Sequence, residues 1–91
     1  MKYYAVILHV KNDDIAKEYR QAHLDFIEEM CAAGHIHSSG RLLDAGGLII
    51  YQGESIASVE TIVKDDPYIS HGARSYEIFE WQMKLAEEII E

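Results

Sequence analysis

The segment KYYAVILHV, residues 2–10, is rich in Tyr, Val and Ile, and as a strand it would have two apolar faces. One face carries Tyr3, Ala5, Ile7 and His9, and the other carries Tyr4, Val6, Leu8 and Val10. A strand with two apolar faces has to be covered on both sides. Because a chain of 91 residues has helices enough for only one side, we expect a second subunit to cover the other side in a homodimer.

A long amphipathic helix is predicted after this strand. Asn12-Asp13-Asp14 offers an N-cap and carboxylates that suit the positive end of the helix dipole, and Gly34 suits the C-cap. Apolar side chains recur at intervals of three and four residues and predict the core face, namely Ile15, Tyr19, Ala22, Phe26 and Met30. His23 would lie about 40° from the centre of this stripe, on its edge, partly buried and still open to a cleft.

The middle of the chain predicts a β-hairpin. Its strands are expected at Ile36 to Leu43 and at Leu48 to Gln52, and Asp44-Ala45-Gly46-Gly47 forms a tight reversal between them.

The last third predicts a second helix and a final strand. Gly53-Glu54-Ser55 caps a helix that should run to Asp65-Asp66, where Pro67 is expected to end it. A strand follows from Ser75 to Trp81, and a short tail helix is expected at about 85–90. With right-handed crossovers, this βαββαβ order predicts a single α+β domain over residues 1–91, with a ferredoxin-like antiparallel sheet and the helices on one face. Two bare sheet faces packed together would make a dimeric α+β barrel.

Composition restricts the partners and the location. Sixteen acidic residues against eight basic ones give a net charge of −8 without any basic run, which argues against nucleic acid as a partner. The first strand is too short to cross a bilayer and has no signal-peptide cleavage site, so we expect no membrane association and a cytoplasmic location. The single cysteine, Cys31, fits a reducing compartment and is expected to be a small buried residue late in the first helix.

Three short motifs resemble the YciI-like, or YCII-related, protein family. The run Tyr19 to Phe26 looks like the family's R-x-x-H-L segment, Asp65-Asp66-Pro67-Tyr68 resembles its D-P-[FY] motif, and Tyr76-Glu77-Ile78 with Trp81 is similar to its final strand. The resemblance covers essentially the whole chain. It implies a small dimer with the ferredoxin-like fold, in which His23 and Asp66 form the active-site pair. The sequence departs from the pattern in two places, and either departure could alter the mouth of the pocket: Ser38-Ser39-Gly40 stands where a Gly-Pro turn is common, and His71 stands where a small residue is more common.

Each candidate site residue has two interpretations. Imidazole suits proton transfer near neutral pH, and a carboxylate bonded to one ring nitrogen fixes the tautomer that the other nitrogen presents, so His23 and Asp66 could be catalytic. Asp66 could instead cap the turn that follows it. Arg20 lies one helical turn before His23 and could hold a substrate carboxylate, or it could be solvated and paired with an acidic neighbour. Tyr68 could face the pocket as a substrate-binding residue or belong to the core.

No metal and no cofactor are expected. His35 and His37 would share a strand face, and His9 or His71 could add a ligand, but no cysteine or acidic residue stands at an informative distance. Phosphate-binding loops, the dinucleotide fingerprint and the nucleophile elbow are all missing from the sequence.

Two functions therefore remain open. The first is a cofactor-free lyase or isomerase that acts through His23 and Asp66 on a small carboxylated or aromatic-derived molecule; relatives in the wider barrel group include muconolactone isomerases and ring dehydrochlorinases. The second is a non-catalytic dimeric module that binds a small molecule or supports assembly. The fold alone does not decide between them.

Overall fold

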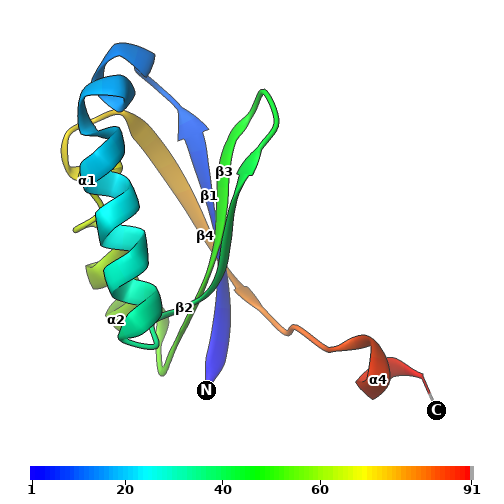
Figure 1. The fold of residues 1–91 in the computed structure, drawn as a ribbon. Coiled ribbons are helices and arrows are strands. Elements are labelled where there is room, and N and C mark those ends of the chain that lie inside the picture. Colours follow the sequence, from blue (N-terminus) through cyan, green and yellow to red (C-terminus); the bar gives the residue numbers. More distant parts are fainter. Residues whose placement is uncertain (91) are drawn as a thin grey trace.

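The computed structural model of the chain describes residues 1–90 as a four-stranded antiparallel sheet with the longer helices on one face (Figure 1). The elements are β1 (Lys2–Val10), α1 (Asp13–Ala32), β2 (Ile36–Leu42), β3 (Gly46–Gly53), α2 (Ile56–Val63), α3 (Pro67–Ser70), β4 (Arg74–Trp81) and α4 (Ala86–Ile89). The strands lie in the order β2-β3-β1-β4. The predicted ferredoxin-like α+β fold is confirmed. Across residues 1–90, none of the helices has the length and apolar character needed to cross a membrane.

The two faces of β1 have different surroundings. Tyr4, Val6 and Leu8 point toward the helices and are buried. They form the core with residues of β2, β3 and α2, namely Ile36, Ile49, Tyr51, Val59 and Val63. On the opposite face of the sheet, Phe79 and Trp81 are 50% and 45% exposed. The chain thus covers one face of its sheet, as expected for this strand pattern.

Helix α1 is turned relative to the predicted stripe. Its ends are as expected, because Asn12 caps the N-terminus by accepting from the N–H of Ile15 at 3.1 Å, and Gly34 has a positive φ of 84°. However, Ala22 is exposed, whereas Ala16 is buried and Ile27 packs against the core.

This rotation has a physical reason, because α1 packs against both the sheet strand β2 and the short helix α3. His23 therefore lies near the middle of the covered face and not on its edge. Phe26 is half-buried instead of central to the core. Cys31 is exposed, so the prediction that it is buried was wrong.

Pro67 begins a helix instead of ending one. Helix α2 starts after the capping residue Ser55 and ends at Val63. Pro67 then occupies the first turn of α3, for which Asp66 is the N-cap. The fixed φ and missing N–H of proline suit that first position. The extra turn matters because it brings Asp66 and Tyr68 against α1.

Candidate active site

His23 on α1 and Asp66 at the start of α3 are in contact. The His23 Nδ1 atom lies 2.7 Å from Asp66 Oδ1, and the two side chains are only 13% and 1% exposed. The same Oδ1 atom accepts the backbone N–H of Tyr68 at 2.9 Å. Asp66 therefore caps the turn and contacts His23 at once, so the two interpretations of this residue are compatible.

The hydrogen bond determines which ring nitrogen is free. An ionised carboxylate can only accept, so we assign the hydrogen of the neutral ring to the Nδ1 atom that faces Asp66. The other nitrogen, Nε2, then has an unshared electron pair. Because His23 lines a cavity, this nitrogen is the one that a ligand can meet.

Two buried side-chain oxygen atoms have no hydrogen-bond partner among residues 1–90. They are Asp66 Oδ2 and the hydroxyl of Tyr51 on β3. Burial, followed by the negative charge of Asp66, raises the pKa of Tyr51 well above its usual value of 10.0. The charge of Asp66 thus affects Tyr51 in the hydrophobic core as well as His23.

The ring of Tyr68 fixes the plane of the imidazole. Its centroid lies 3.9 Å from that of His23, and the planes differ by 5°. The guanidinium carbon of Arg74 is 5.1 Å from the centre of the Tyr68 ring. Arg74 also donates to the carbonyl of Ala73 at 3.0 Å and contacts Asp13 at 3.4 Å. Tyr68 is therefore held between a histidine and an anchored arginine.

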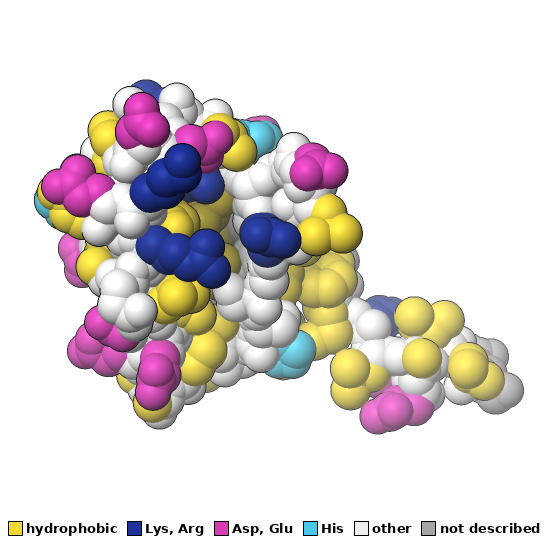
Figure 2. Space-filling view, turned by 45° about the horizontal axis from the view of Figure 1, so that its top comes forward, with side chains coloured by type: hydrophobic (Ala, Val, Ile, Leu, Met, Phe, Trp, Pro, Cys, Tyr) yellow, Lys and Arg dark blue, Asp and Glu magenta, His cyan; other side chains and the backbone are white. Residues whose placement is uncertain are grey.

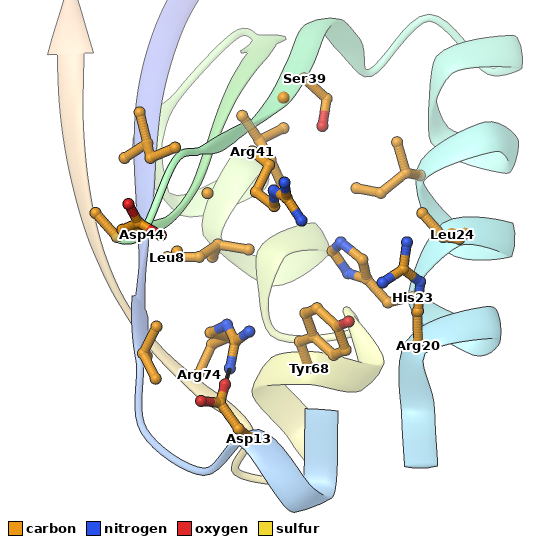
Figure 3. A pocket seen from close by; sticks show the side chains of 18 of the residues that line it. Leu8, Asp13, Arg20, His23, Leu24, Ser39, Arg41, Asp44, Tyr68 and Arg74 are labelled. Carbon is orange, nitrogen blue, oxygen red and sulfur yellow. Dashed lines mark hydrogen bonds and ion pairs between the residues drawn. The ribbon is translucent and has the colours of Figure 1, made fainter. Parts of the chain in front are cut away.

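A cavity of about 800 Å³ opens beside this stack, which is within the usual size range of small-molecule sites. Figure 2 shows a hollow in the surface with apolar side chains at its bottom and basic side chains, drawn in dark blue, around it. Its walls come from α1, the β2–β3 hairpin, α3 and the ends of β1 and β4. In Figure 3, the side chains of Arg20, His23, Arg41 and Tyr68 extend toward the same space.

Sequence reasoning named Arg20, His23 and Tyr68 among these lining residues but missed Arg41 and Arg74. These two come from β2 and β4. No spacing along the chain joins them to His23, because only the sheet brings their strands beside α1. One signal was available: arginine is scarce in this acidic chain and each arginine falls in or beside a predicted element.

The other histidines serve different contacts. His9 pairs with Glu77 at 2.6 Å, the His37 ring meets Tyr3 edge-on, and His71 stacks on Tyr19. Within residues 1–90, no group of three or more side chains is arranged to hold a metal ion. Of the positions that depart from the family pattern, Ser39 and Gly40 do line the cavity.

Comparison with known proteins gives solved structures of similar fold and a family. The fold resembles that of 5-chloro-2-hydroxyhydroquinone dehydrochlorinase (TftG) from Burkholderia phenoliruptrix AC1100, solved in complex with 2,5-dihydroxybenzoquinone. The TM-score is 0.76 at 20% identity, over 92% of this chain and 96% of that chain. No curated protein sequence matches the chain. The family model of the YCII-related domain matches residues 1–82, and the chain therefore belongs to the YCII-related family.

Proposed function

We propose that the protein is a cofactor-free acid–base enzyme of the lyase or isomerase type, in which His23 moves a proton and Asp66 orients the imidazole. Its substrate is a small carboxylated or aromatic-derived molecule, which Arg20 and Tyr68 help to bind. The observation that carries the proposal is the 2.7 Å contact between a fully buried carboxylate and a histidine that lines the cavity.

The buried carboxylate is better explained by chemistry than by stability. A carboxylate taken out of water loses hydration that a few hydrogen bonds seldom fully replace. A buried oxygen without a partner, such as Asp66 Oδ2, costs about 1–3 kcal/mol more. The cap that Asp66 provides for α3 uses Oδ1 only and leaves the burial of Oδ2 unexplained, and sites that break a local rule in this way are often functional.

The proposed reaction uses the two ring nitrogens differently. Nε2 takes a proton from the substrate, and the imidazolium that forms is stabilised by Asp66 through Nδ1. The electron pair of the broken C–H bond moves into the substrate. In an isomerisation, the proton returns to another atom; in an elimination, a leaving group departs with its own bonding pair.

The dehydrochlorinase with the same fold supports this reaction type, since its name describes an elimination from a hydroxylated ring. The likeness at 20% identity concerns the fold, so the assignment to this chain rests on His23 and Asp66.

The proposal includes a homodimer in the cytoplasm. Phe79 and Trp81 leave apolar surface on the uncovered sheet face, which a second copy would bury. The single free cysteine is compatible with a reducing compartment.

Deuterium incorporation tests the proposal at its first step, the removal of a proton from carbon. The protein is incubated in D₂O with a panel of hydroxylated rings, ring-derived lactones and small carboxylic acids, and uptake is followed by mass spectrometry. We expect exchange into at least one compound, with a rate that falls about 10²- to 10⁴-fold in His23→Asn. His71→Asn is the matched control, because His71 also stacks on a tyrosine but contacts no carboxylate in residues 1–90.

A compound that binds in the cavity but exchanges equally slowly with the wild type and with His23→Asn would overturn the enzymatic proposal. That result would favour the alternative, a non-catalytic binding module.

A further inference from the structure

Arginines and lysines are distributed unequally over this molecule. The chain has three arginines, Arg20, Arg41 and Arg74, and all three line the cavity that contains His23. None of the lining residues identified in the described part of the chain is a lysine. With a net charge of −8, the protein as a whole repels anions. The cavity therefore differs in both charge and side-chain type from the rest of the surface.

The three arginines do not have the same contacts. Arg74 is anchored, since it pairs with Asp13 and the carbonyl of Ala73 and lies against Tyr68. For Arg20 and Arg41, residues 1–90 provide no ion pair and no side-chain hydrogen bond. Of the alternative interpretation of Arg20, the exposed position agrees with the structure, but residues 1–90 supply no acidic partner. Two guanidinium groups remain available to a ligand.

The two free arginines come from different walls. Arg20 lies one turn before His23 on α1. Arg41 extends from β2 toward the imidazole ring of His23 (Figure 3). The lining carboxylate Asp44 belongs to the turn of that hairpin and makes no ion pair with either arginine in residues 1–90. The planar fork of arginine is suited to bidentate contact with a carboxylate, which a lysine does not reproduce.

We propose that the ligand of this cavity is a small dicarboxylate, with one carboxylate on Arg20, the other on Arg41, and the carbon that loses a proton between them at His23 Nε2. Only the position of the reacting carbon at His23 Nε2 rests on the proposed acid–base function. On this account Arg41 anchors the distal group. Arg20 acts at the reacting end, where it stabilises the negative charge that the C–H electron pair delivers to the substrate.

Direct binding measurements test the number of anionic groups. Calorimetric titrations of the intact protein use succinate, glutarate and phthalate as dicarboxylates, acetate and benzoate as monocarboxylates, and inorganic phosphate as a compact dianion. We expect at least one dicarboxylate to bind more tightly than every monocarboxylate and than phosphate. Arg20→Gln and Arg41→Gln should each weaken that dicarboxylate roughly 10- to 100-fold. Both substitutions should weaken dicarboxylate binding more than the control Lys17→Gln does. This control removes the same charge from the exposed side of α1.

Equal affinity for monocarboxylates and dicarboxylates would overturn the proposal, as would an Arg41→Gln protein that binds like Lys17→Gln. Tighter binding of phosphate than of every dicarboxylate would also overturn it, because one compact site would then be present. Arg41→Lys, which keeps the charge but not the fork, should recover only part of the affinity.

The outcome is separable from that of the deuterium test. His23→Asn should still bind the dicarboxylate, since both arginines are retained. Dicarboxylate binding without exchange would leave this inference standing and remove the enzymatic proposal. Deuterium exchange into a neutral compound at a rate that Arg20→Gln and Arg41→Gln do not change would support the enzymatic proposal and overturn the dicarboxylate inference.

Discussion

Two histidines stack on tyrosines at the junction of α1 and α3, and only one of them is a candidate for catalysis. His23 of α1 stacks on Tyr68 of α3 at 3.9 Å and 5°, and His71, at the end of α3, stacks on Tyr19 of α1 at 3.8 Å and 6°. The two pairs are nearly alike in geometry. Helix α1 supplies the histidine of the first pair and the tyrosine of the second. Stacking of a histidine on a tyrosine therefore does not by itself identify a catalytic residue in this protein.

The environment makes the difference between the two stacks. His23 contacts a fully buried carboxylate and lines a cavity that also receives three arginines. His71 is exposed, and Tyr19 supplies its ring contact. Substitutions in the two stacks are thus natural controls for one another, and the comparison makes the following predictions.

The largest effect on stability is expected at the carboxylate. Asp66→Ala removes the N-cap of α3 and the acceptor for the Tyr68 N–H, and should lower the free energy of unfolding by about 2–3 kcal/mol. The exposed neighbour Asp65→Ala should stay within about 0.5 kcal/mol of the wild type. Urea denaturation measures both; equal midpoints would mean that Asp66 does not hold α3 in place.

A smaller effect is expected from the tyrosines. Tyr68→Leu and Tyr19→Leu each remove one aromatic stack, which should lower the free energy of unfolding by about 0.5–1.5 kcal/mol. Only Tyr68→Leu should also weaken dicarboxylate binding, because Tyr68 lines the cavity and Tyr19 does not. The account would be contradicted if Tyr19→Leu weakened binding as much as Tyr68→Leu.

The smallest effect is expected in the titration of the tyrosines. Burial and then the charge of Asp66 raise the pKa of Tyr51, whereas a hydrogen bond from the Tyr76 hydroxyl to Glu60 is the main cause that raises the pKa of Tyr76 to about 12. Asp66→Asn should therefore lower the pKa of Tyr51 without restoring its usual value, and should leave Tyr76 unchanged. NMR of ¹³C-labelled tyrosine measures both groups, and His71→Asn should move neither.

The same shifts have a consequence for stability. A tyrosine whose pKa is raised on folding contributes stability that is fully present below its unfolded value of about 10 and is lost as pH rises toward the folded value. Between about pH 10 and 12, the advantage of the wild type over Tyr76→Phe should decline. A constant difference over this range would show that the Glu60 hydrogen bond does not persist in solution.

The sequence predicted the sheet and its helices because these depend on local signals. The two-faced strand at residues 2–10, the Asn12 and Ser55 caps and the glycine-rich reversal all act over a few residues. The rotation of α1 was not predicted because the helix packs against two elements, β2 and α3. A periodic apolar stripe predicts only one buried face against one neighbouring element. The single turn of α3 was too short to show a period, although Asp66 before Pro67 is itself a start signal.

The site was predicted only in part for a related reason. The family resemblance nominated His23 and Asp66, helical spacing suggested Arg20, and the place beside Asp66 suggested Tyr68. The fold brings these four residues together. Arg41 and Arg74 belong to no motif and reach the cavity through strand pairing, which is a long-range property. Their roles become visible only from the arrangement of the walls.

The tautomer of His23 decides whether the ring nitrogen on the cavity side can act as a base. Long-range ¹H–¹⁵N NMR of the neutral imidazole distinguishes a hydrogen on Nδ1 from one on Nε2. The account predicts that His23 carries its hydrogen on Nδ1, bonded to Asp66, and that this preference disappears in Asp66→Ala but not in His71→Asn. A neutral His23 with its hydrogen on Nε2 would contradict the account, because the nitrogen facing the cavity would then have no electron pair with which to take a proton.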